Sequence, residues 1–398
     1  MKTNSRAAQL IEVLLVSTKL GLTSFGGPTA HLGYFYNEYV HKKKWLDEKS
    51  YADLVALCQF LPGPASSQVG IGIGTIRAGV LGGLVAWLGF TLPSVIVLVL
   101  FALLLQGYNV SGAGWIHGLK IVAVVIVAQA VLSMGQKLAS GRTRATIAAL
   151  TAVITLLWHT SYTQIVLIVL AGIAGMLIYR HNESLDNTGR TINLTVPVNR
   201  RFAISCLGLF FGFLIVLPIL RQWTNSEWIT MFDSFYRAGA LVFGGGHVVL
   251  PLLQNEIVPL GWLSKEDFLA GYGVAQAVPG PLFTFAAYLG AMITGIPGAI
   301  VATIAIFLPA FLLVIGALPF WYAVRNNSRV QGILFGVNAA VVGILMAALY
   351  DPLWISSIVQ PVDFALAVVL FLLLQFWKMP PWFVVAIGLI GGYFTSFM

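Results

Sequence analysis

Two basic residues lie inside apolar stretches of this sequence, each shortly before a run of glycines. Lys19 precedes Phe25-Gly26-Gly27-Pro28, and Arg237 precedes Phe243-Gly244-Gly245-Gly246. A charge near the centre of a bilayer costs about 2.5–3.5 kcal/mol on insertion scales, so such residues are rare without a purpose. Two matched cations therefore predict a site that attracts an anion. They could instead neutralise acids on their own helices, since Arg237 follows Asp233 at the spacing of one helical turn.

The glycines and two proline motifs predict breaks in the helices. Adjacent glycines are poor residues for a helix interior, so Gly26-Gly27 and Gly244-Gly245 should expose backbone N–H groups that can bind an anion. Close packing of helices through small residues is the alternative. Pro62-Gly63-Pro64 and Pro279-Gly280-Pro281 must also break helices, because proline lacks the N–H and clashes with the preceding turn. Such irregular backbone at membrane depth is tolerated where it is buried in protein or lines a wet cavity.

Further polar residues accompany these breaks. Gln59 and Gln276 each shortly precede a Pro-Gly-Pro motif and could donate amide hydrogen bonds to an oxyanion. Glu38 and Glu256 follow the glycine turns, where they could relay protons, form gating salt bridges or simply be solvated. Short broken segments in corresponding places of two halves predict a transport site. Kinks that serve only helix packing are the alternative.

The sequence lacks the common patterns of catalytic and metal sites. Its histidines are scattered, and no HExxH, GxSxG, Walker A or dinucleotide-binding pattern occurs. We therefore expect neither an enzyme nor a bound metal or other cofactor. Cys58 and Cys206 both fall in apolar segments, which argues against a disulfide.

The matched motifs belong to an internal repeat. An offset of 218 residues, with two later slips of one residue, pairs Ser24-Phe25-Gly26-Gly27 with Val242-Phe243-Gly244-Gly245, Lys19 with Arg237, Asn37-Glu38 with Asn255-Glu256, Gln59 with Gln276, Pro62-Gly63-Pro64 with Pro279-Gly280-Pro281, and Pro93 with Pro309. Chance would hardly match an acid, a base, a Gln and a Pro-Gly-Pro in one order. We expect a first repeat at 1–180, a connector with a central segment at 181–225, and a second repeat at 226–398.

Composition places these motifs in a membrane. Of the 398 residues, 58% are hydrophobic and only 9% charged, against about 25% charged in a soluble domain. The apolar runs approach the roughly 20 residues that span a bilayer as a helix and are too continuous for barrel strands. We expect an all-α polytopic membrane protein in a lipid bilayer. Thirteen segments are expected near 6–29, 51–76, 77–105, 115–138, 143–159, 163–179, 200–220, 227–247, 268–293, 296–322, 329–351, 361–378 and 380–398.

The spacing of the segments predicts how the two repeats are oriented. They begin an odd number of crossings apart, so the halves should be inverted copies around the lone central segment, as in many secondary transporters. Lys and Arg concentrate in the loops of one side, which favours a cytoplasmic N-terminus and explains the net charge of +8 without nucleic acid. Lys42, Lys43, Lys44 and Lys49 are exceptions in the predicted outer loops. A re-entrant hairpin at a glycine or Pro-Gly-Pro segment would explain them.

The paired motifs resemble those of the chromate ion transporter family. The resemblance rests on Leu22-Thr23-Ser24-Phe25-Gly26-Gly27-Pro28, Gln59-Phe60-Leu61-Pro62-Gly63-Pro64, Val242-Phe243-Gly244-Gly245-Gly246-His247 and Gln276-Ala277-Val278-Pro279-Gly280-Pro281, and on the six-one-six layout. It covers essentially the whole chain. It implies a plasma-membrane exporter that gives microbes chromate resistance, with fused halves of opposite topology.

These features together predict a secondary transporter that exports chromate, and related oxyanions such as sulfate, by alternating access. Membrane potential or exchange for protons or anions would drive it. Lys19 and Arg237 would attract the anion, and the glycine and Pro-Gly-Pro turns would coordinate it. An anion channel, a carrier of another oxyanion or of an organic anion, and an intramembrane enzyme or scaffold are the alternatives. A homodimer is compatible with any of them.

Overall fold

The computed structural model describes residues 5–107, 114–158, 161–179, 197–243, 245–321 and 327–395. These residues form helices and loops and contain no strand. Within these ranges, five helical stretches are long and apolar enough to cross a bilayer, and three shorter apolar helices accompany them. The expected all-α polytopic membrane fold is confirmed.

The helices of the first half and the central segment are α1 (Arg6–Thr23), α2 (Gly27–Phe35), the π-helix η1 (Tyr36–Lys42), α3 (Glu48–Phe60), α4 (Ala65–Gly107), α5 (Gly114–Leu138), α6 (Arg142–Leu157), α7 (Ser161–Ile178) and α8 (Arg200–Trp223). The helices of the second half are α9 (Glu227–Leu241), η2 (Gly246–Val248), α10 (Val249–Ile257), η3 (Val258–Leu260), α11 (Lys265–Ala275), η4 (Leu282–Thr284), α12 (Phe285–Ala317), η5 (Leu318–Phe320), α14 (Ser328–Ala348), η6 (Leu349–Trp354), α15 (Ile355–Ser357), α16 (Pro361–Gln375) and α17 (Pro381–Thr395).

The first glycine turn closes a helical hairpin. Gly26 and Gly27 both have positive φ angles, 94° and 79°, which glycine adopts without a steric cost. The chain on either side runs antiparallel. Residues progressively earlier in α1 contact progressively later residues of η1 and the residue after it, in the pairs Lys19–Glu38, Ser17–Tyr39 and Glu12–Lys43. The chain therefore returns to the end of the bundle where α1 began.

Two more hairpins follow in the first half. The Pro-Gly-Pro motif joins α3 to the start of α4, and these helices are antiparallel, with Leu54 against Gly72 and Trp45 against Arg77. The long helix α4 then folds back at Ala78-Gly79, where the backbone leaves helical geometry. Residues 80–107 form the long span that follows.

The second half repeats this arrangement. Arg237 of α9 contacts Glu256 of α10 across the second glycine turn, and Gly271 of α11 packs against Tyr288 of α12 across the second Pro-Gly-Pro. The helix α12 folds at Thr294-Gly295, as α4 does at Ala78-Gly79.

Four of the thirteen expected segments thus belong to hairpins and do not run straight from one end of the bundle to the other. They are the segments expected at 6–29, 51–76, 227–247 and 268–293. Replacing two successive crossings by two hairpins leaves the direction of the next span unchanged. The hairpins are therefore compatible with the prediction that the two halves are inverted.

The basic cluster that conflicted with the predicted topology lies at the end of the bundle where α1 begins. Glu12 of α1 pairs with both Lys43 and Arg77, at 3.0 and 3.3 Å. The expectation that Lys42, Lys43, Lys44 and Lys49 occupy outer loops was wrong, because the glycine turn is a re-entrant hairpin.

The long spans of the two halves run in opposite directions. The rings of Trp87 and Phe307 pack together, and the Gln106 amide donates to the carbonyl oxygens of Ala291 and Met292. The C-terminal end of α4 therefore lies beside the fold of α12 at Thr294-Gly295. The fold of α4 at Ala78-Gly79 lies at the opposite end of the 80–107 span. This antiparallel contact is what an inverted pair of repeats requires.

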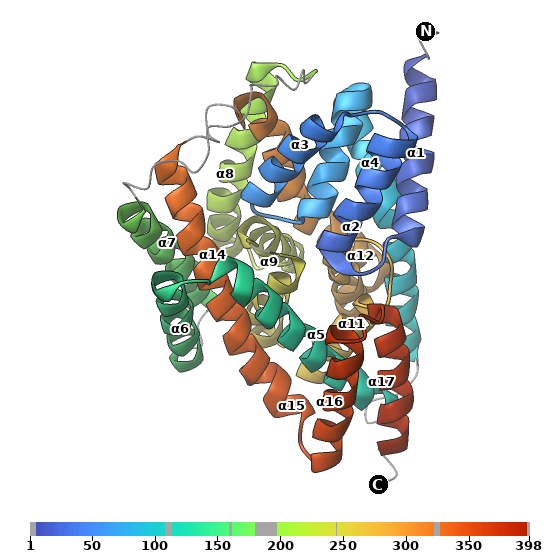
Figure 1. The fold of residues 1–398 in the computed structure, drawn as a ribbon, viewed down its shortest axis with the longest axis vertical. Coiled ribbons are helices and arrows are strands. Elements are labelled where there is room, and N and C mark those ends of the chain that lie inside the picture. The colour runs from blue at the N-terminus through green and yellow to red at the C-terminus, as the bar shows by residue number, and fades with distance from the viewer. Residues whose placement is uncertain are drawn as a thin grey trace.

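The peripheral helices of each half pack against helices of the other half. In Figure 1, α6 and α7 lie beside α14, and α16 and α17 lie beside α5. Glycines permit these close approaches: Gly175 faces Gly332 and Gly336, while Gly118 faces Gly388. Each half is therefore held by helices of the other.

Candidate functional site

The broken segments of the two halves meet and bond to each other. The Gly63 N–H of the first Pro-Gly-Pro donates to the Val242 carbonyl oxygen at 2.7 Å, and the Gly280 N–H of the second donates to the Ser24 carbonyl oxygen at 2.9 Å. Ser24 and Val242 are partners in the repeat, as are the two glycines. The two bonds are therefore one contact made twice, around a pseudo-two-fold axis between the halves.

This junction lies near the middle of the long spans. The helix α1 runs parallel to the 80–107 part of α4, with Arg6 beside Gly79 and Gly21 against the backbone of Phe90. At the level where α1 ends, the Ser94 hydroxyl donates to the Pro279 carbonyl oxygen at 2.7 Å. Ser94 is close to the midpoint of the 80–107 span. The turns thus meet at the depth where secondary transporters place their sites.

Helices begin immediately after each of the four turns. These are α2 after Gly26, α4 after the first Pro-Gly-Pro, η2 with α10 after Gly245, and η4 with α12 after the second Pro-Gly-Pro. Their first N–H groups lack helical partners, and the N-terminal end of each helix dipole is positive. Four such ends at one junction suit an anion, without any fixed cation.

The structure brings each predicted cation to the predicted acid of its own half. Lys19 Nζ lies 3.0 Å from Glu38 Oε2, and Arg237 lies 2.7 Å from Glu256 Oε2. Both cations precede their glycine turn by about two helical turns, roughly 10 Å. They flank the junction on either side and do not converge in it. Each predicted cation is therefore ion-paired within its own half and is not a free cation at the junction.

The two ion pairs differ in their surroundings. Lys19 is 54% exposed, whereas Arg237 is 10% exposed and also binds the fully buried Asp233 at 2.9 Å. The spacing of Asp233 and Arg237 in the sequence indicated that pair as the alternative to an anion-binding Arg237. The sequence did not predict Arg221, which reaches Asp233 and Glu256 from the end of α8.

The remaining predicted residues differ in their exposure and in their hydrogen-bond partners. Gln59 is exposed on α3, whereas the Gln276 amide nitrogen is enclosed and has no partner among the residues that the structure describes. Of the two, only Gln276 offers a buried amide donor. Gly245 precedes η2 as its N-cap, and Gly244 lies outside the described residues. His247 Nδ1 lies 2.9 Å from the Tyr272 hydroxyl.

Sequence reasoning missed several buried polar residues at the junction. Ser24, His31, Thr91 and Ser94 are at most 2% exposed. His31, Thr91 and Ser94 stand singly in apolar runs, where no spacing marks them, and Ser24 was recognised only as part of the first glycine motif. Their burial depends on the meeting of α1, α2 and α4, which the sequence does not reveal. Within the described ranges, no three His, Cys, Asp or Glu side chains are grouped to hold a metal ion.

Comparison with known proteins identifies the family. The chromate transporter family model matches residues 11–176 and again 229–393. The chain is 28% identical to the chromate transport protein of Pseudomonas aeruginosa, over 84% of this chain and 78% of that protein. It is 27% identical to the chromate transport protein of Cupriavidus metallidurans, over 96% and 92%. An uncharacterized transporter of Bacillus subtilis matches at 30% identity, over 41% of this chain but 95% of its own length. No solved structure matches. The chain belongs to the chromate transporter family.

Proposed function

We propose that this protein moves chromate out of the cytoplasm across the cell membrane, as a secondary transporter with alternating access. The observation that carries the proposal is the junction of the four turns, held by the Gly63–Val242 and Gly280–Ser24 hydrogen bonds. It gathers helix N-termini of both halves at mid-depth, where a dianion would be attracted. Membership of the family and the names of the relatives point to chromate as that anion.

The charge distribution supports a cytoplasmic N-terminus. Arg6, Lys43 and Arg77 lie together at the end where α1 begins, linked through Glu12 and Gly79. Basic residues of short loops remain on the cytoplasmic side of a membrane. With this orientation, the Lys19–Glu38 pair faces the cytoplasmic half of the path and the Arg237–Glu256 pair faces the outer half.

The two ion pairs act as gates that an anion opens by competition. An arriving dianion attracts Lys19, weakens its bond to Glu38 and so gains access to the junction. On the other side, two neighbouring cavities share Gln164 and Asn255 in their linings; one also contains Arg237 and Glu256, and the other contains Asp351. Both cavities are small, and they lie between the second gate and the Asp351 end of α14, where an outer path would have to open. Rocking of the inverted halves would open one gate while the other stays closed.

The membrane potential is sufficient to drive export. An inside-negative potential favours exit of an anion by about 2.3 kcal/mol per charge per 100 mV, and a dianion gains about twice that. Exchange for protons or for another anion would add to this gradient.

Uptake of radiolabelled chromate into everted membrane vesicles tests the function. We expect saturable accumulation that an inside-positive potential accelerates and that vesicles without the protein lack. Equal uptake in both kinds of vesicle would contradict the proposal. Unitary currents in planar bilayers, without saturation, would show an anion channel.

A further inference from the structure

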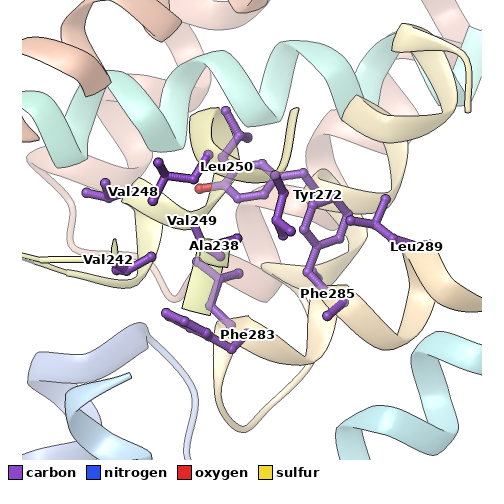
Figure 2. Packing of buried hydrophobic residues seen from close by; sticks show 14 of the residues in the cluster. Ala238, Val242, Val248, Val249, Leu250, Tyr272, Phe283, Phe285 and Leu289 are labelled. Atoms are coloured by element: carbon purple, nitrogen blue, oxygen red, sulfur yellow. The ribbon is translucent and has the colours of Figure 1, made fainter. Parts of the chain in front are cut away.

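The two sides of the junction are chemically different, although the repeat relates them. Around the second Pro-Gly-Pro the first half supplies polar side chains, whose partners in the repeat are apolar: Ser24 with Val242, His31 with Val249, Thr91 with Phe307 and Ser94 with Ala310. Figure 2 shows Val242 and Val249 within the apolar core of the second half. The duplicated fold can therefore be built with apolar residues at these positions.

Ser24 and Ser94 of the first half contact the second Pro-Gly-Pro, and His31 and Thr91 lie next to Phe90, whose backbone approaches Gly280. The Ser24 carbonyl oxygen accepts from the Gly280 N–H at 2.9 Å, and the Ser94 hydroxyl donates to the neighbouring Pro279 carbonyl oxygen at 2.7 Å. The His31 ring packs edge-on against Phe90, with centroids 5.5 Å apart. Thr91 follows Phe90 on α4 and lies one helical turn before Ser94, on the same face.

Three of these side chains have unused hydrogen-bonding groups. The Ser24 hydroxyl, His31 Nδ1 and the Thr91 hydroxyl are buried and have no partner among the described residues. A buried polar group without a partner destabilises a protein appreciably, and polar atoms kept in such places usually serve a ligand or water. On the other side, Ser67 and Gln68 follow the first Pro-Gly-Pro, and the Gln68 amide nitrogen donates to the Pro62 carbonyl oxygen. The Ser67 hydroxyl and Gln68 Oε1 also lack partners among the described residues, but the repeat partners of Ser24, His31 and Thr91 on this side are apolar.

We propose that these groups form a single oxyanion seat beside the second Pro-Gly-Pro, without an equivalent at the positions of Val242, Val249 and Phe307 in the other half. Ser24, Thr91 and His31 would bind the oxygens of a tetrahedral dianion, next to the N-terminus of α2. The seat carries no full positive charge, since Lys19 is paired with Glu38. The proposal rests on the proposed function and assigns its substrate to one side of the pseudo-two-fold axis.

Chromate transport by variants without these hydroxyls tests the seat. Ser24→Ala and Thr91→Val each remove one hydroxyl and change the side-chain volume little. In proteoliposomes we expect the KM for chromate to rise about tenfold or more, as loss of a hydrogen bond to a charged group requires, with little change in the maximal rate. Inhibition by sulfate should weaken in parallel. Thr91→Ser, which keeps a hydroxyl, should keep the KM near its original value.

Ser67→Ala is the matched control, because it removes an unpartnered buried hydroxyl beside the first Pro-Gly-Pro. We expect its KM to stay within about twofold. A KM unchanged in Ser24→Ala and Thr91→Val, or raised as much in Ser67→Ala, overturns the seat. If a substituted protein fails to fold, the chromate-induced shift in Tm of the remaining variants decides in the same way. Absence of chromate transport by the unsubstituted protein refutes the proposed function instead.

Discussion

Lys19 and Arg237 correspond in the repeat but have different surroundings. Arg237 holds two carboxylates that are almost wholly enclosed, Asp233 and Glu256, whereas Lys19 is half exposed. Removing one partner of a buried ion pair leaves an uncompensated charge. Pairs with an exposed cation contribute little, and Lys42, 3.4 Å from Glu38 Oε2, would still pair with this buried carboxylate after loss of Lys19. The same substitution should therefore have unequal effects at the two positions.

Arg237→Ala should lower the free energy of unfolding by about 3–5 kcal/mol. Lys19→Ala, its matched control, should lower it by no more than about 1 kcal/mol. Thermal unfolding of the purified proteins in detergent measures both. Equal losses of stability would show that the two pairs are equivalent and would remove the basis for distinguishing the gates.

A charge exchange tests the gate on the α1 side. Lys19→Glu places two carboxylates together and should reduce chromate transport at least tenfold, because the hairpin ends repel each other. Adding Glu38→Lys restores an attractive pair and should recover much of the rate. If the double variant transports no better than Lys19→Glu alone, the cation itself and not the pair is needed.

At the scale of elements, the sequence predicted the breaks but not the path of the chain through them. Glycine and proline chemistry is local, so Gly26-Gly27 and Pro62-Gly63-Pro64 could be recognised as breaks without any tertiary information. Whether a broken helix continues or turns back depends on contacts between distant residues, such as Glu12 with Lys43. The conflict of the Lys42–Lys44 cluster with the positive-inside pattern was the one sequence signal of a return.

A substitution at Gly280 tests whether the second Pro-Gly-Pro turn must approach Ser94 and its other neighbours closely. Its φ of +100° disfavours other residues, and a Cβ would collide with the Ser94 hydroxyl. Gly280→Ala should therefore abolish transport or unfold the protein. Gly261 also has a positive φ, +71°, but open space around it, so Gly261→Ala should cost about 1 kcal/mol and leave chromate uptake intact. Similar transport by the two variants would show that transport does not require the close approach of the second Pro-Gly-Pro turn to Ser94.

At the scale of the whole molecule, the sequence could not predict that the peripheral helices of each half pack against the other half. The repeat predicted two inverted copies, and the antiparallel contact of α4 with α12 agrees with that. Nothing in the apolar segments indicated that α6 and α7 pack on α14, because packing through Gly175 and Gly332 requires both surfaces to be known. The polar seat was hidden for the same reason.

Labelling of introduced cysteines tests the topology. After Cys58 and Cys206 are replaced, Lys49→Cys should react with an impermeant maleimide in everted vesicles, because α3 begins at the end that holds Lys43. Leu260→Cys, after α10 at the opposite end, should react in intact cells. Reaction of Lys49→Cys from outside would show that the segment at 6–29 crosses the membrane, and it would contradict the hairpin at Gly26-Gly27.

The most direct test of one oxyanion site between the two halves is to locate chromium in the protein. Crystals grown with chromate should show a single anomalous scattering peak beside Gly280, within bonding reach of Ser24 and Thr91. A chromium peak next to Lys19 or Arg237, or two equal peaks related by the pseudo-two-fold axis, would contradict it.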